Sequence, residues 1–502
     1  MDILAPFPRR WRAVVTLLAR AALLLLLLVA ALVLALRPDH RDGLRSADRL
    51  FAAGRYHEAL AILTPLAPAL PEAQARLGML RALRGEHAAA ERQLRAAMLR
   101  GLGPVDYQRA LLYLGRALAD AGRSDLAART WALAEDCRSA EACAYRAPAR
   151  LLAADEALRR GEYLLAMAGM QAALAEPLPP AWAEAARFRL AALRAGSAPE
   201  VARQDLTLAV PLARNDPLIS PLLPVTGDGP RRLRAALDAS PAGRPQLLGM
   251  FYLHLGLYGL AEEQFTRVDP HGPDALGAAA YAAYTRWRAG DASGGLKRLQ
   301  ALVEAHPDDP RARTLLALTY LTNNASDAAH DELDAVARLR PDDPGVALAW
   351  ASWYAARREY DQASRAYRRA VALAPQADQG RYALLAAKFH LATTFELCET
   401  GLSFAETAAT RSAGNPEALT VLAAHRYHCG QFASAAEAAR AAQQTGGGPA
   451  ALYYLGAALA NLGDAENART ALIRAADLAP ASDWRRRAEL ALGMLPLYAS
   501  SK

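Results

Sequence analysis

The hydrophobic pattern in the middle of the chain repeats every 34 residues. Between Asp309 and Pro375, stretches with apolar residues at helical spacing come in pairs, and a proline closes each pair, first Pro341 and then Pro375. This spacing predicts amphipathic helices, and each pair predicts a helical hairpin. Since one hairpin cannot bury its apolar face alone, its recurrence predicts an all-α solenoid of stacked hairpins.

The hairpin that ends at Pro375 resembles the tetratricopeptide repeat. The resemblance rests on small, aromatic and turn residues at fixed spacing, namely Ala351, Tyr354, Arg358, Tyr360, Ala363, Tyr367, Ala370 and Pro375. Arg358 departs from the glycine that the family prefers at the turn. We expect the two helices to lie closest at Ala363, because a longer side chain there would push them apart. The resemblance implies a right-handed superhelical solenoid, here of roughly ten to twelve repeats.

Similar patterns extend the array over most of the chain. We predict an N-terminal array at 44–213, a proline-rich break at 214–245, a C-terminal array at 246–482 and a capping helix at 483–498. The break holds six prolines, and this density favours a loop or a hinge, although the run 231–237 can form one helix inside it. A polar terminal helix keeps the last apolar face of a solenoid from water.

A second hydrophobic pattern stands near the N-terminus. Residues 13–36 are apolar apart from one threonine and one arginine, and about 20 apolar residues cross a bilayer as a helix. Arginines before and after this segment favour, by a modest difference, a cytoplasmic segment at 1–12 and repeats outside the cytoplasm. A cleaved signal peptide is the alternative, with a passable cleavage site at Val33-Leu34-Ala35.

Composition adds constraints on partners. The chain is 53% apolar and 22% charged, with a net charge of +7 that comes almost entirely from arginine. The arginines are scattered beside Asp and Glu, without a basic stripe carrying interleaved aromatics, so we expect no nucleic-acid binding. No phosphate-binding loop, His-Glu-x-x-His or Gly-x-Ser-x-Gly motif occurs, so we expect no catalytic site and no cofactor.

Three potential metal ligands share one side of a predicted helix. His425, His428 and Cys429 are spaced i, i+3 and i+4, and imidazole and thiolate suit zinc. A fourth ligand is not evident in the sequence. We therefore interpret these residues as packing or groove residues and predict no metal site.

The four cysteines form two plausible pairs. Cys137 and Cys143 flank a predicted loop between helices, and Cys398 and Cys429 lie in consecutive C-terminal hairpins. Disulfides at both pairs would fit an oxidising compartment. Four small buried apolar residues are the alternative.

The family resemblance implies that partners bind in a concave groove lined by the first helix of each hairpin. Transferring those positions to this sequence gives Arg116, His254, Tyr284, Trp287, Arg288, Tyr453 and Asn461. Arginine and aromatic residues are enriched at binding hot spots, although each of these residues could also be ordinary surface or packing. The near-total lack of lysine argues against the family's clamp for a partner's C-terminal carboxylates.

These observations lead to a membrane-anchored, non-enzymatic scaffold that binds proteins or peptides. The lysine-poor composition looks bacterial, and by analogy we expect partners from a cell-envelope or polysaccharide-export system. A carbohydrate-binding or enzyme-associated envelope module is one alternative. A cytoplasm-facing regulatory adaptor, in which the cysteines would be free thiols, is another.

Overall fold

The computed structural model describes residues 40–137, 139–209, 218 and 229–499. The predicted segments 1–12 and 13–36 therefore lie outside the described residues, as does most of the predicted break before residue 229. Within the described part of the chain, no helix combines the length and the apolar character needed to cross a membrane.

The described chain is built from helices, and strands are absent from it. Its first half contains α2 (His40–Ala52), α3 (Tyr56–Leu66), α4 (Pro71–Leu83), α5 (His87–Leu99), α6 (Pro104–Asp120), α7 (Ser124–Ala132), η1 (Leu133–Glu135), α8 (Ala140–Cys143), α9 (Arg146–Arg159), α10 (Tyr163–Leu174), α11 (Pro180–Arg194) and α12 (Pro199–Leu208).

The second half continues the same pairing. It contains α13 (Gly229–Asp238), α14 (Arg244–His254), α15 (Tyr258–Thr266), α16 (Ala275–Arg288), α17 (Ala292–Ala305), α18 (Pro310–Thr322), α19 (Ser326–Leu339), α20 (Pro344–Ala356), α21 (Tyr360–Leu373), α22 (Gln379–Thr393), η2 (Leu397–Gly401), α23 (Leu402–Arg411), α24 (Pro416–His428), α25 (Phe432–Gln444), α26 (Pro449–Asn461), α27 (Ala465–Leu478) and α28 (Asp483–Ala499). The prediction of an all-α solenoid is confirmed for this part of the chain.

Capping and turn residues set the hairpin boundaries. The side chains of Asp309, Asp343 and Asn415 accept hydrogen bonds from backbone N–H groups at the starts of α18, α20 and α24, and a proline follows each of them. At the turn between α20 and α21, Arg358 has a φ of 62°, and the equivalent Gly430 has a φ of 74°. The arginine therefore occupies the left-handed conformation that favours glycine, at some conformational cost.

In many of the described hairpins, a small residue of the first helix lies opposite a large residue sixteen positions later. A Cβ added to Gly249 would lie 2.6 Å from the ring of Phe265, and one added to Gly456 would lie 2.7 Å from Leu472. Other buried pairs with this spacing include Gly78 with Leu94, Gly115 with Trp131, Ala154 with Met170, Ala317 with Leu333, and Ala351 with Tyr367. Close approach of the two helices thus depends on a small side chain in one and a bulky side chain in the other.

The apolar core continues through the described part of the predicted break. There α13 covers the run 231–237, for which the sequence allowed one helix inside the break, and α14 starts two residues before the predicted array boundary at 246. Leu233 and Leu237 are fully buried in the same cluster as Leu206 of α12 and Leu248 of α14. Packing therefore runs from the first array into the second across these residues.

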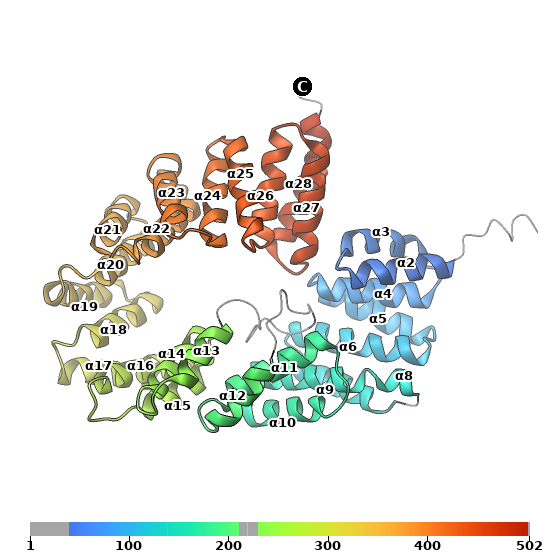
Figure 1. Cartoon of the computed structure of the whole chain (residues 1–502), viewed down its shortest axis with the longest axis horizontal. Coiled ribbons are helices and arrows are strands. Elements are labelled where there is room, and N and C mark those ends of the chain that lie inside the picture. The colour runs from blue at the N-terminus through green and yellow to red at the C-terminus, as the bar shows by residue number, and fades with distance from the viewer. Residues whose placement is uncertain (1–39, 138, 210–217, 219–228, 500–502) are drawn as a thin grey trace, which may run out of the picture.

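The stacked hairpins curve until the last helices lie beside the first ones (Figure 1). The backbone N–H of His57 in α3 donates a hydrogen bond to Asp477 of α27, 2.9 Å away and 420 residues later. Arg84, which follows α4, donates to Glu489 of α28 at 2.8 Å. The sequence predicted a right-handed superhelical solenoid with a terminal capping helix. In the structure the described hairpins form a ring, and α28 also contacts the first hairpins.

We expect Gly115→Ala to destabilise the protein by about 1–3 kcal/mol, because the added methyl group would overlap the indole of Trp131. Gly493→Ala is the control, because Gly493 is exposed in α28 and a Cβ added to it would meet no atom within 4 Å. That change should stabilise by about 0.5–1 kcal/mol. Urea unfolding followed by circular dichroism measures both. Equal effects of the two substitutions would show that the small-to-large contact does not limit the hairpin.

Candidate functional site

A cavity of about 830 Å³ lies where the first array meets the second. Its walls come from the C-terminal ends of α6 and α9, the start of α10, the turn between α14 and α15, and the residue after α16. The lining residues are Arg116, Asp120, Leu158, Arg159, Arg160, Gly161, Tyr163, Gly256, Leu257, Tyr258, Gly259 and Ala289. The solenoid stack thus brings hairpins about a hundred residues apart in sequence to one site.

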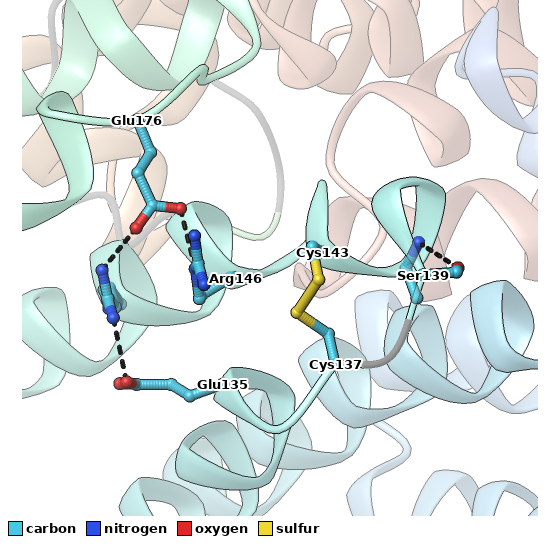
Figure 2. The surroundings of a disulfide bond; sticks show 8 residues. Glu135, Cys137, Ser139, Cys143, Arg146 and Glu176 are labelled. Carbon is cyan, nitrogen blue, oxygen red and sulfur yellow. Dashed lines mark hydrogen bonds and ion pairs between the residues drawn. A yellow bond between two sulfur atoms is a disulfide. The ribbon is translucent and has the colours of Figure 1, made fainter.

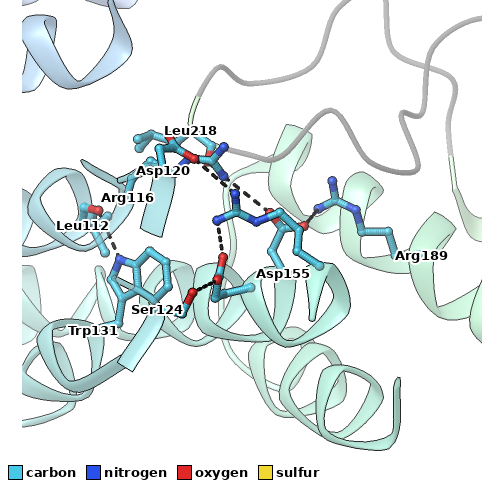
Figure 3. A network of polar contacts seen from close by, with 10 residues as sticks. Leu112, Arg116, Asp120, Ser124, Trp131, Asp155, Arg189 and Leu218 are labelled. Atoms are coloured by element: carbon cyan, nitrogen blue, oxygen red, sulfur yellow. Dashed lines mark hydrogen bonds and ion pairs between the residues drawn. The ribbon is translucent and has the colours of Figure 1, made fainter. Parts of the chain in front are cut away.

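One wall of the cavity is formed by arginines and carboxylates that pair with one another (Figure 3). Arg116 donates to Asp120 at 2.8 Å and to the carbonyl oxygen of Leu218 at 3.2 Å. Behind it, the buried Asp155 lies 3.7 Å from Arg116 and 3.1 Å from Arg189. Burial lowers the pKa of Arg189, against the opposing effect of Asp155. Arg116, a predicted groove residue, therefore lines the cavity, but two carboxylates already balance its charge.

The rim of the cavity carries an arginine held by two tyrosines. The guanidinium of Arg288 lies 4.8 Å from the ring centroid of Tyr258 and 6.0 Å from that of Tyr284, and it donates to both hydroxyl groups. No carboxylate of the described residues forms an ion pair with it. Stacking on aromatic rings leaves the guanidinium edge available while restricting its motion. Arg288 is thus an exposed, oriented cation beside the cavity.

Other predicted groove residues serve different purposes. Trp287 is buried against Gly295 and belongs to the hairpin core, while His254 is exposed at the end of α14. On α26, the ring of Tyr453 lies tilted against that of Trp484, with the ring centroids 5.5 Å apart. Asn461 donates to the carbonyl of Ala457 in its own helix. Of the seven predicted positions, only Arg116, Tyr284 and Arg288 lie in or beside the cavity.

Two tyrosines that were not among the predicted groove residues face the cavity from the hairpin turns. Tyr163 and Tyr258 each begin the second helix of a hairpin, two residues after the turn glycines Gly161 and Gly256. Both tyrosines line the cavity. The recurring Gly-x-Tyr pattern could have identified these tyrosines. Their convergence on one cavity, however, depends on how the hairpins stack, which the pattern does not show.

Both cysteine pairs form disulfides in the structure. Cys137 and Cys143 link the end of η1 to α8, beside the capping residue Ser139 (Figure 2). Cys398 and Cys429 link η2 to the end of α24, and so join two consecutive hairpins.

The three residues considered as metal ligands do not converge. The sulfur of Cys429 is part of a disulfide, and His428 is exposed. His425 is fully buried, with Nδ1 2.9 Å from the carbonyl oxygen of Val421. Across the described ranges, no three His, Cys, Asp or Glu residues are placed to hold a metal ion.

A second buried imidazole lies close to His425. His390 is fully buried, with Nδ1 2.6 Å from the carbonyl of Phe395, and the methylene of His390 and the ring of His425 both approach Gly401. Burial lowers the pKa of both histidines. The two rings are therefore packed in their neutral form.

Comparison with known proteins supports the resemblance found in the sequence. Residues 286–352 match the tetratricopeptide repeat family. This segment runs from the last turn of α16 into α20 and includes the hairpin α18–α19. No curated protein matches the chain.

Several solved structures show a distant likeness. Yeast Tom70 is 15% identical, with 92% of this chain and 88% of that chain covered and a TM-score of 0.35. YrrB, described as a TPR protein with an unusual peptide-binding site, is 18% identical over 38% of this chain and 96% of its own, at 0.32. PilW, described as a type IV pilus biogenesis factor, is 14% identical over 43% and 98%, at 0.37.

The buried histidines predict a loss of stability in acid. Because burial lowers their folded-state pKa, the unfolded chain takes up protons first as the pH falls below about 6.5. The urea midpoint should therefore fall between about pH 7.5 and 5.5, and His425→Gln should reduce this dependence. His330→Gln, at a partly exposed histidine, is the matched control. An unchanged pH dependence in His425→Gln would contradict the prediction.

Proposed function

We propose that this protein is a membrane-anchored, non-enzymatic scaffold that binds extended segments of partner proteins at the cavity between its two arrays. Tetratricopeptide repeats generally mediate protein–protein interactions, and residues 286–352 match that family. The observation that carries the proposal is Arg288, oriented by Tyr258 and Tyr284 at the rim of the cavity.

The site suits a peptide with a carbonyl-rich or acidic stretch next to an apolar or aromatic residue. The Arg288 guanidinium offers planar N–H donors to carbonyl or carboxylate oxygens, and it has no competing carboxylate among the described residues. Tyr163 and Tyr258 offer aromatic surface inside the cavity. Rigid aromatic and arginine contacts of this kind supply much of the energy in protein interfaces.

Two features support a location outside the cytoplasm. Disulfides persist in oxidising compartments, and all four cysteines of this chain are paired. The apolar segment at 13–36 has the length of a membrane-spanning helix. With the arginine distribution around it, we propose a cytoplasmic N-terminus and repeats on the opposite side, serving a cell-envelope or polysaccharide-export assembly by analogy.

Binding should depend on Arg288. Partners can be captured by crosslinking in native membranes and identified by mass spectrometry, and peptides from the crosslinked partner can then be titrated against the purified chain. Arg288→Ala should weaken peptide binding about tenfold, a loss of about 1.4 kcal/mol. Arg381→Ala is the matched control, because that arginine also stacks on a tyrosine, Tyr382, but does not line the cavity. Equal losses in both variants would reject this site.

The orientation can be tested with reporters fused after Lys502. An alkaline phosphatase fusion, which needs an oxidising compartment to form its disulfides, should be active, and a reporter that works only in the cytoplasm should be inactive. Deleting 13–36 should abolish the phosphatase signal, since that segment would direct export. Activity of the cytoplasmic reporter alone would reverse the proposed orientation.

A further inference from the structure

The two ends of the solenoid meet through polar contacts. Arg84 donates to Glu489 at 2.8 Å, and Arg485 donates to the carbonyl oxygen of Arg84 at 3.3 Å. Arg485 also lies 3.6 Å from Glu86 and 3.0 Å from Glu489. Together with the hydrogen bond from His57 to Asp477, these contacts join α27 and α28 to α3 and the α4–α5 turn.

This junction differs in kind from those between neighbouring hairpins. Consecutive hairpins share apolar clusters, one of which runs without interruption from α2 to α16. Within the described chain, no apolar cluster contains residues from both the first and the last hairpins. The side chains of Arg84 and Arg485 are only 14% and 13% exposed, so their charges are partly shielded from solvent, whereas Glu489 is 30% exposed.

Polar contacts without an apolar core hold two surfaces together weakly. Partly exposed ion pairs gain modest Coulomb energy, lose it to salt screening, and cost side-chain entropy. Opening this junction exposes no buried apolar cluster, whereas separating neighbouring hairpins would expose one. Compared with the apolar junctions between the described hairpins, this seam is therefore easier to open.

We propose that the contact between α27–α28 and α3–α5 is a gate, and that the ring opens and closes there to admit partner segments to its interior. The seam is specific, because Arg84, Glu86, Arg485 and Glu489 pair in one alternating arrangement. It is also reversible, because its contacts are polar. The admission of partners rests on the proposed function, but the opening and closing do not.

Asp477 makes this gate sensitive to pH. It faces His57, Glu58 and Arg55 of the first hairpin and Arg84 after α4. Burial raises the pKa of Asp477 to about 6, so the closed ring binds this proton more tightly than an open one. Closure should consequently be favoured as the pH falls from about 7 to 5, through proton uptake at Asp477.

An engineered disulfide tests whether the seam closes in solution. A Cβ built at Gly85 lies 3.8 Å from the Cβ of Ala481, which matches the spacing of a disulfide. The full chain carrying Gly85→Cys and Ala481→Cys should crosslink under mild oxidation, as shown by peptide mass spectrometry. Gly122→Cys with Ala481→Cys is the matched control, because Gly122 sits at the next equivalent turn with a similar φ of 76° but has no atom within 4 Å of its added Cβ.

Charge reversal tests whether the ion pairs hold the seam. Glu489→Arg should increase the radius of gyration measured by X-ray scattering of the full chain, and Arg84→Glu added to Glu489→Arg should restore it. Asp477→Asn should keep the ring closed and remove the pH dependence of the radius of gyration. Two results would contradict the proposed gate. One is crosslinking no stronger than in the Gly122→Cys control, and the other is a radius of gyration that does not change in Glu489→Arg.

Partner admission has its own readout. Association through the seam requires an open ring, so its rate scales with the fraction of open chains. With at least a tenth of the unlocked chains open, the disulfide-locked ring should associate with a captured partner peptide at least about tenfold more slowly than the same variant before oxidation. Unchanged association in a chain that is demonstrably locked would overturn gating while leaving the scaffold function standing. Absence of peptide binding in either state would instead count against the proposed function.

Discussion

The fold depends on one contact that recurs inside its hairpins. A glycine or alanine of the first helix receives a bulky side chain from sixteen residues later, as Gly115 receives Trp131 and Ala351 receives Tyr367. The small residue sets how near the two helices lie, and the large one fills the space between them. Because the pair recurs, hairpins of similar shape stack with similar small rotations, and the accumulated rotation gives the curvature of the solenoid.

That curvature produces two kinds of junction in one molecule. Neighbouring hairpins meet through apolar side chains, as α12, α13 and α14 do through Leu206, Leu233 and Leu248. The first and last hairpins meet through arginines and carboxylates. Apolar burial makes the first kind cohesive, and solvent screening makes the second kind weaker. In the part of the chain that the structure describes, neighbouring hairpins are thus held by apolar burial and the two ends of the stack by polar contacts.

The candidate site follows from the same geometry. Its cavity is lined by residues at hairpin turns, which the stack arranges side by side, so Tyr163 and Tyr258 face one space although 95 residues separate them. The charge of Arg116 is balanced by Asp120 and Asp155 and helps to hold one wall. Among the described residues, Arg288 contacts the hydroxyls and rings of two tyrosines and pairs with no carboxylate, which leaves its charge available for a ligand.

The sequence by itself determined the helices, their pairing and the solenoid, because the 34-residue period, the Asp-Pro and Asn-Pro helix starts and the small residue at Ala363 all act over short distances along the chain. It also indicated both cysteine pairs and placed Arg116 and Arg288 among the candidate binding residues. Only the tertiary structure decided that Asp477 meets His57, that α13 packs within the proline-rich stretch, and that Trp287 belongs to the core while Arg288 faces outward. These outcomes depend on the small rotation between each hairpin and the next, added up over many hairpins. A local sequence pattern does not determine that total rotation.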